Sequence, residues 1–159
     1  MTLSIFSAVL LTLSSTHFKP SVVDSVSKGT VLVENIVSFN SYSEEHDVIT
    51  FMLKVTNLGN KKIPDLSVSN RSKYVQFYVN GQLNRAMEMS LNNGLEALNG
   101  RKTLSRNQSD TFSGGWGLKP DSGLLVQYGN EFIVQWRYRG IFSKKIKVNI
   151  KDKLVKILD

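Results

Sequence analysis

The side chains that could act as acids, bases or metal ligands are few and scattered along the chain. There are two histidines, His17 and His46, and no cysteine. His46 stands in the acidic sequence EEHD at 44–47, and histidine together with carboxylates can bind zinc or harder cations. Consecutive residues of one loop rarely converge on a single ion, and His17 is far away in the sequence. We therefore predict a solvated loop at 40–47, no metal site and no cofactor.

The residue patterns that support catalysis are also missing. A serine or threonine nucleophile needs a neighbouring base, and only His46 in the acidic loop and His17 near the N-terminus are available. A carboxylate-pair hydrolase needs two acids brought together, whereas the acids here fall in turns and loops. The sequence GGWG at 114–117 lacks the lysine and the following helix of a phosphate-binding loop. We predict that the protein is not an enzyme and has no catalytic residues. A hydrolase with no recognisable motif is the third choice.

A run of basic residues near the C-terminus is the strongest pattern for binding. Residues 131–150 alternate between apolar and polar side chains with a period of two, as two adjacent strands half-buried on a core do. The side expected to face the core carries Phe132, Val134, Trp136, Tyr138, Ile146, Val148 and Ile150. The first candidate partner-binding surface lies on the other side and consists of Arg137, Arg139, Lys145 and Lys147.

Most of the excess positive charge of the chain lies in this region. The net charge is +7 at pH 7, and residues 131–159 carry eight basic residues against three acidic ones. Such an excess attracts acidic proteins, anionic surfaces or nucleic acid, but basic strands also protect a sheet from pairing with other sheets. Tyr138 falls on the side opposite the basic residues, so a nucleobase could not stack on its ring while the phosphates contact those basic residues. The expected partner is a protein or an anionic envelope component, and not nucleic acid.

Trp116 is the second candidate partner-binding residue, because it stands among glycines in the sequence FSGGWGL at 112–118. An exposed indole there would be an aromatic platform for a ligand. The alternative is a bent strand whose glycines allow a neighbour to approach closely while the indole fills the core. The sequence leaves both interpretations open.

Short segments rich in β-branched residues predict the elements that position these side chains. Besides the pair at 131–150, they lie at 30–39, 48–57, 74–87 and 111–118, with a short edge segment at 61–69, and residues 124–128 lead into the pair. Asn80-Gly81 predicts a type I′ hairpin turn, and the break in the pattern at Glu34 and Asn35 predicts a bulge or an edge position. No long helix is expected, so the sheets should be antiparallel. The predicted fold is an all-β, antiparallel, immunoglobulin-like sandwich of about seven or eight strands, with a closed barrel as the alternative.

The first residues predict a signal peptide at 1–18. An apolar run at 3–13 has the size of a signal-peptide core and is too short for a membrane span of about 20 residues. No basic residue precedes the run and no Ala-x-Ala-like site follows it, so an uncleaved anchor and a segment of the folded domain remain alternatives. A periplasmic or secreted location is expected, with the cytoplasm as the alternative. No stable membrane span is expected.

A single domain is predicted at 30–159, because the chain of 159 residues is long enough for one ordinary core. The segment 19–29 contains Pro20 and several serines and predicts a linker. The absence of cysteine excludes disulfides and argues against a small disulfide-stapled secreted module.

Three segments, ITFMLKVTNLGNKKIPDLSV, YVQFYVNGQ and TLSRNQSDTFSGGWGL, follow one another over about residues 45–120. They resemble bacterial immunoglobulin-like domains of the intracellular proteinase inhibitor type and related envelope sandwiches. In those domains a strand ending in V-x-N-x-G-x-x-x-I precedes an extended segment with N-G. Residues 106–109 (RNQS) stand here where such domains have a Pro-Gly turn, so no functional residue is transferred.

The resemblance implies a non-enzymatic module. We expect an exported sandwich that binds another protein or an envelope component. A cytoplasmic proteinase-inhibitor-like or accessory domain of the same fold is the alternative function.

Overall fold

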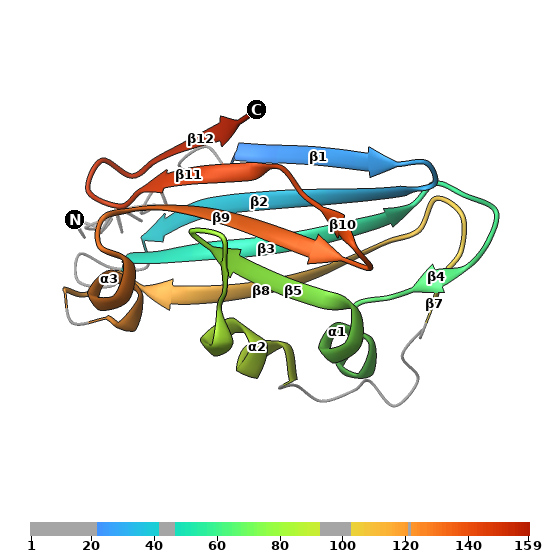
Figure 1. Ribbon diagram of the computed structural model, residues 1–159, viewed down its shortest axis with the longest axis horizontal. Coiled ribbons are helices and arrows are strands. Elements are labelled where there is room, and N and C mark those ends of the chain that lie inside the picture. The colour runs from blue at the N-terminus through green and yellow to red at the C-terminus, as the bar shows by residue number, and fades with distance from the viewer. Residues whose placement is uncertain (1–21, 42–46, 93–102, 121) are drawn as a thin grey trace, which may run out of the picture.

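Two β-sheets packed face to face form the body of the protein (Figure 1). The computed structural model describes residues 22–41, 47–92, 103–120 and 122–159. The predicted signal peptide at 1–18 and the acidic sequence at 44–46 lie outside the described residues. Neighbouring strands pair antiparallel in both sheets, and each sheet keeps two open edges. The chain is therefore an all-β antiparallel sandwich, as predicted, while the immunoglobulin-like arrangement of strands stays a prediction.

The strands divide between a four-stranded sheet, a six-stranded sheet and a short pair. The first sheet has the order β1-β2-β3-β8, with β1 (Val22–Lys28), β2 (Val31–Ser41), β3 (Asp47–Asn57) and β8 (Ser109–Gly117). The second has the order β12-β11-β9-β5-β6, with β5 (Val75–Val79), β6 (Gln82–Leu83), β9 (Glu131–Tyr138), β11 (Lys145–Asn149) and β12 (Leu154–Leu158), and β10 (Ile141–Phe142) pairs with β9. The pair consists of β4 (Ile63–Pro64) and β7 (Thr103–Leu104).

The strand pair predicted at 131–150 is confirmed. β9 and β11 are adjacent and antiparallel, with Val134 opposite Ile146. The apolar side chains predicted to face the core are all buried, among them Trp136 and Tyr138, each 0% exposed. The period of two therefore identified the buried side of the six-stranded sheet correctly.

Aromatic side chains join the two sheets across the core. The ring of Phe51 in β3 lies 5.3 Å from that of Phe77 in β5 and 6.2 Å from that of Phe132 in β9. Phe77 lies 4.5 Å from Trp136. Aromatic pairs of this kind each contribute about 0.5–1.5 kcal/mol beyond the apolar area they bury. This cluster therefore stabilises the packing of one sheet on the other.

The bulge predicted at Glu34 and Asn35 is wrong. β2 pairs with β3 in an unbroken register along its whole length. Asn35 lies on the inner face, fully buried, and its amide nitrogen donates to the backbone carbonyls of Val134 at 3.5 Å and Lys144 at 3.4 Å. The polar residue that breaks the sequence pattern is tolerated because it reaches the backbone of the opposite sheet.

Three short helices lie along one edge and one end of the sandwich (Figure 1). They are α1 (Val68–Tyr74), α2 (Arg85–Asn92) and α3 (Gly123–Tyr128). The sequence predicts a strand at 85–87, where α2 begins, and an edge segment at 61–69, of which only Ile63–Pro64 form a strand, so the structure corrects both predictions. Met87 and Leu91 of α2 are one helical turn apart and both are buried, so the helix covers the side of the core that the strands leave open.

Residues 22–28, predicted to lie in a linker, form β1 instead. They pair with β2 from Val22 opposite Val37 to Lys28 opposite Val31. The two strands are joined at Gly29, whose φ of 65° suits a tight hairpin turn. Asp24 and the serines obscure the strand pattern in the sequence, and the pairing with β2 supplies what local propensity does not.

Candidate functional site

Three of the predicted binding residues, Arg137, Lys145 and Lys147, meet on the outer face of the six-stranded sheet. The three helices leave it uncovered (Figure 1). Residues directly opposite each other in a sheet point to the same side, and the pairings place Arg137 opposite Gln76 and Phe142, and Lys147 opposite Ile133 and Lys156. We call this surface the basic face, and it consists of Gln76, Tyr78, Ile133, Gln135, Arg137, Phe142, Lys145, Lys147 and Lys156.

Arg137 is held rigidly at the centre of the basic face. Its Nη1 donates to Oε1 of Gln76 at 2.9 Å, and its guanidinium lies 5.3 Å from the ring centroid of Phe142. The hydroxyl of Tyr78 donates to the same Gln76 oxygen at 3.1 Å, and the rings of Tyr78 and Phe142 are 5.6 Å apart. Phe142 is nonetheless 43% exposed. A hydrogen bond to Gln76 and a cation–π contact with Phe142 thus position the Arg137 guanidinium beside an aromatic ring that a partner can reach.

Lysines surround this centre. Lys147 forms an ion pair with Glu131 at 2.9 Å, and the hydrogen bond and the charge of Lys147 lower the pKa of Glu131 below its ordinary value. Lys145 and Lys156 are exposed, and neither forms an ion pair within the described residues. The outer face of the four-stranded sheet differs, because Lys54 there pairs with Glu34 at 2.9 Å. Within the described residues, the outer face of the six-stranded sheet therefore carries lysines without an ion-pair partner, whereas Lys54 on the other sheet has one.

Arg139 does not belong to the basic face, although it was predicted there. It occupies the first position of a two-residue turn with Gly140, and both have positive φ, 48° and 82°. The turn directs its guanidinium to within 5.8 Å of the ring centroid of Tyr74. The left-handed conformation costs a residue with a Cβ roughly 1–2 kcal/mol. The equivalent turn at Asn80 and Gly81 has the residue that this geometry favours.

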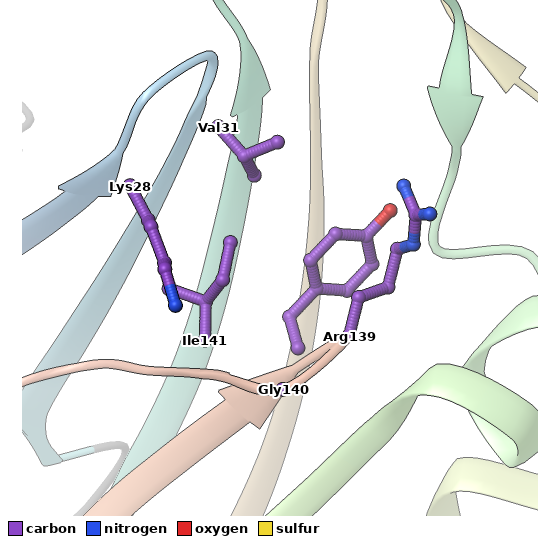
Figure 2. Close-up of a pocket in the computed structure, with 6 residues that line it drawn as sticks. Lys28, Val31, Arg139, Gly140 and Ile141 are labelled. Carbon is purple, nitrogen blue, oxygen red and sulfur yellow. The ribbon is translucent and has the colours of Figure 1, made fainter.

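A cleft opens beside this turn at the end of the sandwich (Figure 2). Its volume is about 390 Å³ and it is lined by Lys28, Val31, Tyr138, Arg139, Gly140 and Ile141. Lys28 and Val31 come from the four-stranded sheet and the rest from the β9–β10 hairpin. The hydroxyl of Tyr138 donates to the carbonyl of Pro64 at 2.5 Å, and burial raises the pKa of Tyr138 to about 12. Tyr138 is therefore a neutral hydrogen-bond donor at physiological pH.

Trp116 lies on the inner side of β8 and not on the basic face. It is partly buried, with its ring centroid 5.2 Å from that of Phe51 and 6.2 Å from that of Phe77. Gly114 leaves room for a neighbour, because a Cβ there would lie 2.8 Å from Cε of Met87. The neighbour that approaches the glycine is thus a side chain of α2, and the indole extends the aromatic core.

Sequence reasoning missed the aromatic and amide members of the basic face. Tyr78 and Gln76 have the parity opposite to the buried Val75, Phe77 and Val79 of β5, so the alternation in YVQFYV carried the signal. Phe142 had no such signal, because β10 is two residues long and its partner strand is known only from the pairing. Lys28 was missed because the segment containing it was taken as a linker.

Comparisons with protein-family models, with curated proteins and with solved structures found no match. Within the described residues, no group of three or more His, Cys, Asp or Glu is placed to hold a metal ion. None of the helices in that part of the chain is both long and apolar enough to span a membrane.

Proposed function

We propose that this protein is a non-enzymatic, exported β-sandwich module that binds an acidic surface of another protein through the basic face. The observation that carries the proposal is the fixed group of Arg137, Phe142 and Tyr78 surrounded by lysines on an uncovered sheet. An anionic envelope component is the second ligand class that the charge would accept.

The arrangement of residue types favours a protein partner. Arginine and aromatic residues are enriched at the centres of protein interfaces, whereas lysine is depleted there and falls on the rim. Here Arg137, Tyr78 and Phe142 are central, and Lys145 and Lys156 are peripheral and exposed. Immobilising the guanidinium beforehand reduces the entropy lost on binding. The peripheral lysines would speed the approach of an acidic partner.

The position of β1 is compatible with export. The predicted signal peptide ends at residue 18, whereas β1 begins at Val22. Cleavage of that segment would leave every described strand in place. The mass of the protein purified from its own host tests this part of the proposal: a shortened chain outside the cytoplasm supports export, and a full-length cytoplasmic chain supports the accessory-domain alternative.

The test of the binding surface compares two triple variants that lose the same charge. Lys145, Lys147 and Lys156 are replaced by Gln in one, and the exposed Lys61, Lys62 and Lys119 in the other. A partner is first recovered by the wild type from extracts of the host and then purified for calorimetry. We expect the first variant to bind this partner about tenfold more weakly, chiefly through slower association, and the second to bind like the wild type.

Two outcomes would contradict the proposed surface. Equal losses in both triple variants would show that net charge alone drives the binding. Unchanged binding by Phe142→Ser, with an unchanged melting temperature, would show that the centre of the basic face makes no contact. Binding of the wild type to anionic vesicles in place of a protein would identify the envelope component as the ligand.

A further inference from the structure

The cleft beside the β9–β10 turn has the composition of a small-molecule site that is separate from the basic face. Its volume of about 390 Å³ lies within the range of small-ligand pockets. Val31 and Ile141 supply apolar walls, and Lys28 and Arg139 stand toward its two sides (Figure 2). The walls come from both sheets, so a ligand here would contact the two layers together.

The two cations of the cleft are available to a ligand. Lys28 and Arg139 are exposed, and within the described residues neither forms an ion pair. Asp65, the acid whose charge acts on Tyr138, is buried and accepts hydrogen bonds from the backbone of Ser67 at 3.1 Å and from Asn70 at 2.8 Å. The described residues that line the cleft include two cations and no acid, so the lining carries a net positive charge.

Arg139 has a positive φ of 48°, a backbone conformation that arginine rarely adopts. Type I′ turns favour Asn before Gly, and the sheet uses that pair at Asn80 and Gly81. Lys153 is another basic residue with positive φ, 50°, and its ammonium pairs with Asp47. Arg139 has a similar positive φ, and its guanidinium lies 5.8 Å from the ring centroid of Tyr74 without an ion-pair partner in the described residues. Backbone strain of this kind is often found at ligand sites.

We propose that this cleft binds a small organic anion, with an oxyanion head between Arg139 and Lys28 and a short apolar body against Val31 and Ile141. A guanidinium fork suits carboxylate and phosphate oxygens alike, so both are acceptable heads. The apolar walls require a body, which distinguishes this ligand from a bare inorganic ion.

The test uses hexanoate and hexyl phosphate as probes and neutral hexanamide as the control, followed by amide chemical shifts of the whole protein. We expect saturable shifts at Lys28, Arg139, Gly140 and Ile141 with an anionic probe, with a Kd of about 1–10 mM, and none with hexanamide. A response to only one of the two anions supports the site and identifies the head group. No saturable shift with either anion, or equal binding of hexanamide, overturns it.

Arg139→Asn separates the ligand role from a structural role. Asn is the residue that the turn prefers, so the melting temperature should stay or rise while binding of the anion weakens about tenfold. Lys28→Gln should also weaken binding, and Lys151→Gln, an exposed charge in the β11–β12 turn, should not. Wild-type affinity in both Arg139→Asn and Lys28→Gln would overturn the proposal.

Discussion

At the scale of single residues, Tyr138 couples the end of the core to the chain outside the sheets. Its ring is fully buried, and its hydroxyl donates to the carbonyl of Pro64 in the β4–β7 pair. Burial is the main reason why its pKa is raised to about 12, and Arg139 partly opposes the shift. The hydroxyl must therefore stay neutral for the fold to keep this contact.

The raised pKa predicts a loss of stability at high pH. An unfolded tyrosine has a pKa of about 10, so the folded state holds this proton more tightly. The resulting stabilisation is complete below a pH of about 10 and is lost as the pH rises through about 12. We expect the urea midpoint of the wild type to fall more steeply over this interval than that of Tyr138→Phe.

Tyr78→Phe is the control for this titration, because it removes a phenol from the outer face. Its pH profile should follow the wild type. If Tyr138→Phe also followed the wild type, the buried hydroxyl would not be responsible for the alkaline loss. At neutral pH, Tyr138→Phe should cost about 1 kcal/mol through the lost hydrogen bond.

The residue scale also shows what the sequence could say about the binding surface. Alternation predicted correctly that Arg137, Lys145 and Lys147 share one side of the sheet. It failed for Arg139, because the period of two ends where the strand turns, and a positive φ redirects the side chain. Gly140 was the signal in the sequence for a turn at this point, and it would have placed Arg139 in the turn and not in the strand.

At the scale of elements, Asn35 connects the two sheets through weak hydrogen bonds and leaves one buried acceptor unpaired. Its two hydrogen bonds to the opposite backbone are long, 3.4 and 3.5 Å, and its Oδ1 has no partner within the described residues. A buried acceptor without a partner costs about 1–3 kcal/mol. The register of β2 does not need the amide, because its pairing with β3 is continuous on both sides of it.

Replacing Asn35 by Val should therefore stabilise the protein by about 1 kcal/mol, since valine suits a central strand and leaves no polar group unpaired. Urea unfolding gives the difference. Asn35→Asp is the informative comparison, because a buried carboxylate should destabilise the fold by more than about 3 kcal/mol. A Val variant less stable than the wild type would show that the amide does hold the sheets together.

Apart from β1, the elements that sequence reasoning missed are short helices and strands of two residues. Strands of the core were predicted because several alternating residues average out local exceptions. The helix α3 spans six residues, and its signals were its flanks: Ser122 before it, and Gly129 after it with a φ of 72° and its N–H donating to Leu125. Its LLVQY sequence is equally compatible with a buried strand, and only the surrounding tertiary structure decides between the two.

At the scale of the whole molecule, the basic face reaches an edge of the six-stranded sheet at β12. β12 is an edge strand of the six-stranded sheet, with the sequence LVKIL, and Leu154 is 62% exposed. No described strand pairs with its outer side, so the backbone groups on that side could pair with a second chain. Lys156 is the only charge within the strand. The basic residues of this region can thus discourage association as well as attract a partner, and Lys156 takes part in both roles.

Lys156→Val should make the protein associate with itself. The change gives the edge strand the uninterrupted apolar sequence LVVIL, and it removes the repulsion that two lysines would exert in an antiparallel pairing of two copies. Light scattering after size exclusion should show a concentration-dependent rise in mass toward a dimer or larger species. Lys147→Val is the matched control, since Lys147 lies directly opposite Lys156 on β11, a strand already paired on both sides. Association of both variants to the same extent would assign the effect to the loss of charge from the face, whereas a monomeric Lys156→Val would show that the basic face carries no protective role and leave partner binding as its function.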